Sequence, residues 1–173
     1  MGEWFLINFR KIEMTITEGL QNHLKNHDFE CPVIMANQTT PIPEYPYCSY
    51  TVTTPLVSDN KGYIVKDGKY YKTFVQIWSF TMQSDDDITA TDIALTAYDW
   101  FAMSGNTYLS DNNIVAQRVG NVTNRDNLLS IEYEYRRGFD VEFLLTSEIA
   151  EDINAEVIET VVINNEITVT KEE

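Results

Sequence analysis

The stretch from Cys31 to Pro55, CPVIMANQTTPIPEYPYCSYTVTTP, constrains the fold more than any other part of the chain. Its first residues, up to Ala36, predict a short apolar strand, and Tyr47 to Thr54 is a β-branched and aromatic run that predicts a longer one. Between them lies a segment rich in proline, which fixes its own φ at about −65° and favours an extended conformation in the preceding residue. We therefore expect a stiff, extended segment, the proline arm (residues 37–46), of a kind suited to docking.

The proline arm is expected to make contacts between chains. Few of its residues can bury a core of their own, whereas its tyrosines offer apolar area with a polar tip, which suits an interface that is wet before assembly. The expected interface residues in and next to the arm are Asn37, Gln38, Pro41, Pro43, Tyr45, Pro46 and Tyr47.

The charge of the chain excludes some classes of function. Its 173 residues include 27 acidic and 12 basic ones, for a net charge of −15, which argues against nonspecific binding to nucleic acid or to an anionic membrane. Cys31 and Cys48 show neither metal-ligand spacing nor a disulfide framework, as expected for synthesis in a reducing cytosol. The first residues do not resemble a signal peptide, and no apolar run approaches the length of a membrane span.

Two helices are predicted. Apolar residues recur every three or four positions from Phe5 to Leu24, which predicts a helix from about Glu3 to His27. A second helix is expected from Ile88 to Met103, with Gly105 placed to end it. The aspartates Asp85–Asp87 directly before it are interpreted as an N-cap with favourable charge at the helix start rather than as a metal site.

Two long strands are predicted around these helices. Tyr70 to Ser84, after a tight turn at Lys66–Lys69, is apolar on both faces and is the candidate central strand. From Leu129 to Leu145, odd-numbered apolar residues alternate with polar ones, which predicts one long strand bent at Gly138. The residues expected in the structural core are Trp78, Phe80, Trp100, Phe101, Phe139, Val141 and Phe143.

Shorter features lie between and within these strands. Ile114 to Val119 predicts a short strand, and the polar stretches 106–113 and 121–127 on either side of it are expected to be loops. Arg136 and Arg137 interrupt the last strand. They either meet a carboxylate of a neighbouring chain, as further interface residues, or are solvated charges on a sheet edge, and the sequence leaves both readings open.

The segment from Glu148 to Glu173 changes composition, with eight acidic residues, one lysine and no aromatic residue. Its apolar stretches, 157–163 and 167–169, predict either a hairpin across the asparagines at 164 and 165 or an arm that orders only against a partner. We expect an α+β fold in residues 1–147, with a mostly antiparallel sheet packed against two helices, and an acidic C-terminal arm or hairpin in residues 148–173 that belongs to the same domain.

No catalytic constellation is evident in the sequence. There is no nucleophile elbow, no glycine-rich phosphate loop and no paired-cysteine site. His23 and His27 have the spacing of two metal ligands on a helix, but no third ligand is visible. We therefore expect no enzymatic activity, no metal and no cofactor.

Four motifs follow one another behind the N-terminal helix. They are PVIMANQTTPIPEYPYCSYTVTTP, VQIWSFTMQSDDD, AYDWF and YEYRRGFDVEF. In this order the chain resembles the tailed-bacteriophage neck and tail-terminator proteins, and more narrowly the neck-terminator group that joins tail to head. The similarity covers about Thr15 to Leu145.

This resemblance implies a structural virion protein of the neck, assembled in the host bacterial cytoplasm. Its relatives form a hexameric ring that caps the tail tube and meets the head-completion or connector ring. The implied partners are further copies of the chain, the tail tube protein and the connector protein. DNA is expected to pass through without specific binding, and no membrane is involved.

From the residues alone, two other classes of function stay open. One is a small binding module, such as an acidic inhibitor that mimics DNA. The other is a hydrolase with a carboxylate site around Asp85–Asp87.

Overall fold

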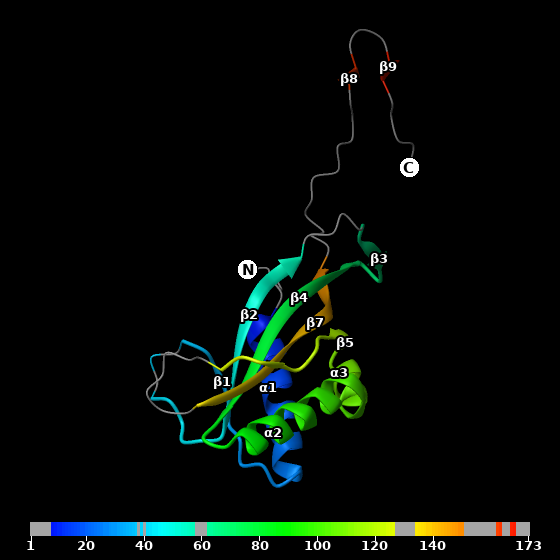
Figure 1. The fold of residues 1–173 in the computed structure, drawn as a ribbon. Coiled ribbons are helices and arrows are strands. Elements are labelled where there is room, and N and C mark those ends of the chain that lie inside the picture. Colours follow the sequence, from blue (N-terminus) through cyan, green and yellow to red (C-terminus); the bar gives the residue numbers. More distant parts are fainter. Residues whose placement is uncertain are drawn as a thin grey trace.

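Two long strands, β4 (Lys69–Ser84) and β7 (Tyr135–Ala150), form the centre of one mostly antiparallel sheet (Figure 1). The computed structural model describes residues 8–37, 39, 41–57, 62–126, 134–150, 162–163 and 167–168. The other strands of this sheet are β1 (Val33–Met35), β2 (Tyr47–Val57), β3 (Ile64–Lys66), β5 (Ile114–Val119) and β6 (Thr123–Asn124). Their order is β1-β2-β4-β7-β5, with β3 beside β4 and β6 beside β7, and β1 and β2 run parallel. This sheet and its helices confirm the predicted α+β class.

Alternation along β4 and β7 places their bulky apolar residues on one face of the sheet. Trp78 lies opposite Val141, and Phe80 lies opposite Phe139. Directly paired residues of antiparallel strands point to the same side, so these four side chains form one apolar layer. The residues expected in the structural core are each at most 4% exposed, and burial of a side chain of this size contributes about 1.5–3 kcal/mol.

The predicted long strand is confirmed over residues 135–145, and β7 continues five residues further, to Ala150, paired with β4 in a single register; residues 129–133 lie outside the described part of the chain. Gly138 sits opposite Thr81. A Cβ atom at Gly138 would lie 2.5 Å from the carbonyl oxygen of Phe80 and 2.8 Å from Cδ of Arg125. Only glycine therefore permits this close approach.

Helices cover one face of the sheet (Figure 1). The first, α1 (Phe9–Asn26), follows Asn8, whose side chain accepts a hydrogen bond from the backbone N–H of Lys11 at 3.0 Å and so caps the helix. The predicted helix is confirmed, but it starts at Phe9, later than predicted, because Asn8 is its N-cap; residues 3–7 lie outside the described part of the chain. Its fully buried apolar residues are Ile16, Leu20 and Leu24. No helix among the described residues is long and apolar enough to cross a membrane.

The second helix continues beyond its predicted end. α2 (Asp87–Asp99) runs into a π-helix, η1 (Trp100–Ser104), and a further helix, α3 (Asn106–Asp111), follows at once. The prediction of a loop at 106–113 is therefore wrong over residues 106–111, because the fully buried Leu109 anchors α3 to the core. Gly105 between the two helices has a φ of −85° and does not adopt the left-handed conformation of a helix-ending glycine. Packing requires a glycine at position 105, because a Cβ atom there would lie 2.5 Å from Cε2 of the Trp100 ring.

Three shorter predictions have different outcomes. The tight turn at Lys66–Lys69 is confirmed, because these two residues pair across it and both residues between them have positive φ. The expected loop at 121–127 contains β6, which pairs with β7, so that prediction is wrong in part. In the acidic tail, β8 (Val162–Ile163) pairs antiparallel with β9 (Ile167–Thr168), which confirms the hairpin.

Candidate assembly interface

The proline arm connects two parallel neighbouring strands. β1 is shorter than the predicted strand at 31–36, and β2 starts where predicted but extends three residues further, to Val57. Parallel strands require a crossover that returns the chain to the end of the sheet where the first strand began. A helix usually makes that return, whereas here an irregular proline-rich segment makes it. Hydrogen bonds from Ala36 N to Tyr50 O (2.8 Å) and from Cys48 N to Pro32 O (2.9 Å) hold its two ends.

Most described residues of the arm are exposed. Ile42 between two of the prolines is 73% exposed, Tyr45 is 42% exposed, and Asn37 and Pro41 are also exposed. The remaining expected interface residues are less accessible: Pro43 and Pro46 are half-buried, Tyr47 is buried, and Gln38 lies outside the described residues. The arm therefore presents an apolar, proline-rich surface next to a buried base.

The base of the arm is tied to the start of β7. The Tyr45 ring stacks on the Tyr47 ring with centroids 5.6 Å apart, and the Tyr47 hydroxyl donates to a carboxylate oxygen of Glu134 at 3.3 Å. Burial, together with the charge of Glu134, raises the pKa of Tyr47 to about 12, so its hydroxyl remains a neutral donor. Arg136 binds the same carboxylate, with Nε 2.8 Å from Oε2. These contacts fix where the arm leaves the sheet.

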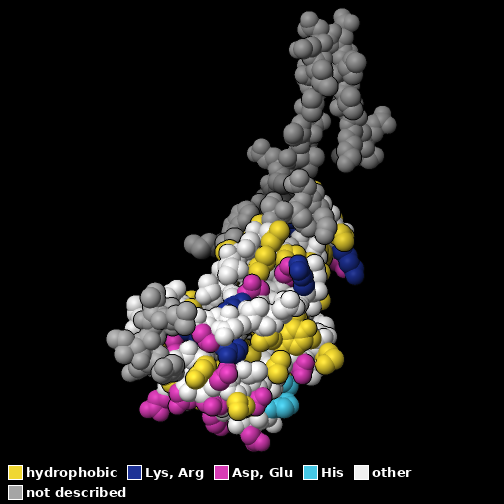
Figure 2. Space-filling model, in the orientation of Figure 1, with side chains coloured by type: hydrophobic (Ala, Val, Ile, Leu, Met, Phe, Trp, Pro, Cys, Tyr) yellow, Lys and Arg dark blue, Asp and Glu magenta, His cyan; other side chains and the backbone are white. Residues whose placement is uncertain are grey.

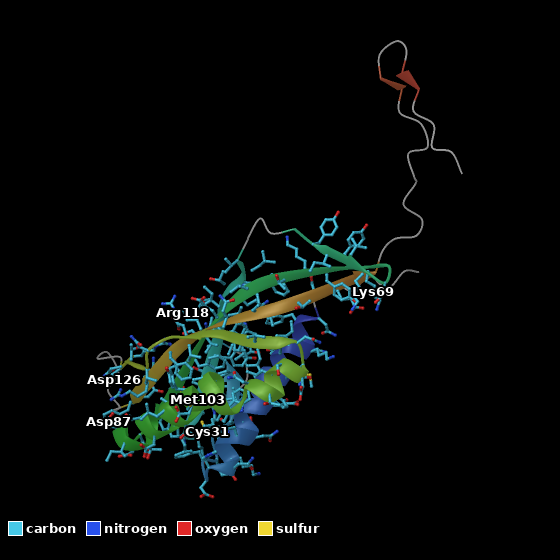
Figure 3. All side chains as sticks on the ribbon, turned by 90° about the vertical axis from the view of Figure 1, so that its right-hand side faces the viewer. Cys31, Lys69, Asp87, Met103, Arg118 and Asp126 are labelled. Atoms are coloured by element: carbon cyan, nitrogen blue, oxygen red, sulfur yellow. The ribbon has the colours of Figure 1, made fainter. Side chains whose placement is uncertain are left out.

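Arg137 joins three segments on the helix side of the sheet. Its side chain is 13% exposed, Nη1 lies 2.7 Å from Oδ1 of Asp126, and Nη2 binds Oδ1 of Asp87 at the start of α2. Asp87 and Asp126 accordingly lie close together at one end of the sheet (Figure 3). Hydrogen bonds from the backbone of Arg136 and from Asn124 and Arg137 lower the pKa of Asp126 even though burial, the largest single effect, raises it.

The two arginines therefore pair with carboxylates of their own chain. The reading as edge charges is wrong, because β7 lies between β4 on one side and β5 and β6 on the other. A contact of Arg136 or Arg137 with a neighbouring chain stays a prediction. Glu134 was detectable as a partner, since it lies two residues from Arg136 and shares its face of the strand. Asp126 and Asp87 carried no such signal, because only the folded chain brings them to Arg137.

The three aspartates at the start of α2, Asp85–Asp87, have structural contacts. Asp86 accepts hydrogen bonds from the backbone N–H and the hydroxyl of Thr89, each at 2.7 Å, which confirms the N-cap. These bonds from Thr89 lower the pKa of Asp86. Among the described residues, no group of three or more His, Cys, Asp or Glu side chains is placed to hold a metal ion.

Sequence reasoning missed a polar cluster on the face of the sheet opposite the helices. Arg125 lies across β4, with Nη1 2.7 Å from Oγ of Ser79 and Nη2 2.9 Å from Oδ1 of Asp140. Burial, the largest single effect, raises the pKa of Asp140, but hydrogen bonding from Ser79 and Arg125, together with the charge of Arg125, lowers it overall. Because the cluster joins β4, β7 and the segment after β6, it stiffens the end of the sheet that carries the arm.

Charge is unevenly distributed over the visible face of the molecule. Figure 2 shows acidic side chains gathered around the lower part of the body, where α2 lies, while Lys and Arg side chains occur both in the middle of this face and at its upper end near β3. The lower end of the visible face is therefore its most acidic part.

Comparison with known proteins identifies the family. A family model described as phage neck terminator protein matches residues 14–173, whereas no curated protein matches the chain. The match includes the acidic tail and so corrects the resemblance inferred from the motifs, which ended at Leu145. The family is structural and non-enzymatic, with a role at the junction of tail and head. The chain therefore belongs to the phage neck terminator protein family and is a virion component.

Proposed function

We propose that the protein forms a hexameric ring that terminates the tail tube and joins the tail to the head-completion or connector complex. The observation that supports this most is the family match over residues 14–173, which implies contacts with the tail tube and the head connector. The ring would form part of the conduit for DNA and would be assembled in the host bacterial cytoplasm.

The surface of the protein suits a ring. Rings are built from heterologous contacts, in which two different patches of one subunit meet and the rotation between copies closes. The proline arm offers one such patch, because exposed apolar residues such as Ile42 stand on a base that hydrogen bonds hold rigid. An arm that is already ordered loses less conformational entropy on docking, so it gains affinity with few contacts.

The net charge suits a conduit. DNA must move through a neck without adhering to it, and a charge of −15 per chain opposes the phosphate contacts that dominate nonspecific DNA binding. The carboxylates need no specific arrangement for this role, because repulsion acts at distances up to the Debye length, about 8 Å at physiological ionic strength.

The proposal is tested by the mass of the purified chain in solution and by negative-stain images of the same sample. We expect a hexamer with a central opening, either alone or after addition of tail tubes. In a phage that lacks this gene, we expect filled heads and separate tails that do not join, or tails of uncontrolled length. Joined, infectious particles produced without the protein would contradict the proposed function.

A further inference from the structure

The outer face of α2 and of η1, which continues it, has an unusual composition for a solvent-exposed helix. Every third or fourth residue along it is exposed and is either apolar or acidic: Ile88, Asp92, Leu95, Asp99 and Met103. Ile88 is 70% exposed and Met103 is 66% exposed. Neither Asp92 nor Asp99 forms an ion pair with a described lysine or arginine. We call these five residues the α2 stripe.

The β3–β4 hairpin has the opposite charge and a similar apolar content. Tyr63, Ile64 and Val65 in and before β3 are 63%, 69% and 53% exposed. Lys66 and Lys72 are exposed and form no ion pair with a described carboxylate, whereas Lys69 is paired with Glu148. In an acidic protein with only 12 basic residues, two unpaired lysines beside three exposed apolar residues form a distinct patch.

The β3–β4 hairpin projects beyond the helices as a well-defined element (Figure 1). Its tight turn has positive φ at both central residues, Asp67 (52°) and Gly68 (70°), which is the geometry that matches the twist of paired strands. The Tyr63 ring packs edge-on against the Tyr70 ring with centroids 4.9 Å apart. Figure 1 shows the hairpin at the end of β4 that extends beyond the helices. Among the described strands, β3 pairs with β4 alone.

The hairpin and the α2 stripe cannot meet within one chain. Figure 3 shows Lys69, in the hairpin, at one end of the molecule and Met103, in the stripe, far from it on the helical side. Figure 1 shows the same separation between β3 and α2. Two complementary patches at different places on one subunit are what a heterologous contact needs.

We propose that the β3–β4 hairpin of one copy docks on the α2 stripe of the next copy. The exposed apolar residues of the two patches exclude water from the centre of the contact, and Lys66 and Lys72, which stand on opposite faces of the hairpin, flank it and pair with Asp92 and Asp99. The occupant is a second copy of this chain, and the inference rests on the proposed ring, whose subunit contact it specifies.

Charge reversal tests this contact in both directions. One variant carries Lys66→Glu and Lys72→Glu, and the other carries Asp92→Lys and Asp99→Lys. Each variant alone brings like charges together at every contact, so we expect its assembly to be weakened at least tenfold. In a mixture, each hairpin finds an oppositely charged stripe on the other variant. We expect the mixture to form rings of wild-type size in which native mass spectrometry finds the two variants in equal numbers.

Matched controls separate this contact from a general effect of charge. Lys11→Glu with Lys25→Glu changes the net charge as the hairpin variant does, and Asp28→Lys with Asp111→Lys changes it as the stripe variant does. All four of these residues are exposed and lie outside both patches. We expect these controls to assemble as well as the wild type. Circular dichroism spectra and melting temperatures of all variants report whether the fold is retained.

A cross-link in assembled particles provides the second measurement. Val65→Cys and Leu95→Cys introduce one thiol in each patch, and the native Cys31 and Cys48 are buried and do not compete. We expect oxidation to link neighbouring copies in particles, and neither single variant to be linked. Rings that all variants form equally well, or particles without this cross-link, would overturn the contact and leave the proposed function intact. A wild-type chain that neither assembles nor occurs in particles would overturn both.

Discussion

At the scale of single residues, Arg137 links α2 electrostatically to the segment after β6. It is nearly buried and holds Asp87 and Asp126 together, so its removal leaves a half-buried carboxylate without its partner. We expect Arg137→Ala to lower the free energy of unfolding by about 2–3 kcal/mol, below the range for a fully buried pair because Asp87 is 53% exposed. Arg118→Ala is the control. Its side chain is 74% exposed, and urea denaturation should show a loss of at most about 0.5 kcal/mol. Equal losses for the two variants would contradict this assignment.

The pH dependence of stability should report on Asp126. The pKa of Asp126 is lowered from an ordinary value of 3.8, so its ionised form stabilises the folded state. That contribution is complete above pH 3.8 and is lost as the pH falls through the lower pKa of the folded state. We expect Asp126→Asn to be less stable than the wild type at pH 6, and the difference to shrink toward pH 2 when both are measured by urea denaturation. A difference that stays constant over this range would refute the role of the ionised carboxylate.

The sequence predicted which residues are buried where apolar residues alternate regularly along a strand. It did not predict contacts between residues that lie far apart in the chain. The alternation along β7 identifies Phe139, Val141 and Phe143 as one face without any knowledge of the fold. The partner of Arg137 at Asp87 is 50 residues away. Nothing local distinguishes that aspartate from its two neighbours, so only the tertiary structure reveals the pair.

At the scale of elements, one glycine sets how closely α1 approaches η1 and α3. A Cβ atom at Gly19 would lie 2.5 Å from Cε1 of Tyr108 and 2.9 Å from Cζ2 of Trp100. Overpacking of this kind costs about 1–3 kcal/mol, while alanine regains up to about 1 kcal/mol of helix propensity. We expect Gly19→Ala to lower the melting temperature. Gly62→Ala is the control, because no described atom lies within 4 Å of its added carbon, and it should leave the melting temperature unchanged.

The proline arm is an element whose stiffness is itself testable. Replacing Pro41 and Pro43 by glycine should leave the sheet and helices folded at a cost of about 1–2 kcal/mol, because the backbone of the unfolded chain gains freedom. We expect this variant to form rings poorly or to attach poorly to tails, as measured by complementation of a phage that lacks the gene. Pro55→Gly, in β2 and outside the arm, serves as the control. Full infectivity of the double variant would show that the arm is a surface loop only.

Element prediction failed mainly for short segments. The stretch 106–113 is polar apart from Tyr108 and Leu109, so its composition indicated a loop. Burial of the Leu109 side chain in the core nevertheless stabilises a short helix there. β6 contains only Thr123 and Asn124 and is defined by its pairing with β7, not by any period of its own. Long elements such as α1 and β4 repeat their signal often enough to be recognised.

At the scale of the whole molecule, the sequence predicted the fold class but not the complete order and direction of the strands. The α+β class followed from one helix at the start of the chain and a second one between two groups of strands, but the parallel pairing of β1 with β2 did not follow, because the proline arm gives no sign of a crossover. The basic hairpin and the acidic α2 stripe became visible as two patches only once β3 and α2 were placed in space. Surfaces that join residues from several elements are not encoded in any single stretch.

Net charge gives the last prediction. Nonspecific DNA-binding proteins reach dissociation constants of about 10⁻⁴–10⁻⁶ M at physiological salt by neutralising phosphates. A chain of charge −15 has few cations to offer, and six of its arginines and lysines in the described structure are already paired with carboxylates. We expect fluorescence anisotropy to detect no binding of double-stranded DNA by the protein at concentrations up to about 0.1 mM in physiological salt, whether monomeric or assembled. A mixture of lysine-rich histone and the same DNA serves as the positive control. Binding that weakens as salt is raised would show that phosphate contacts form, and would argue against a conduit through which DNA passes freely.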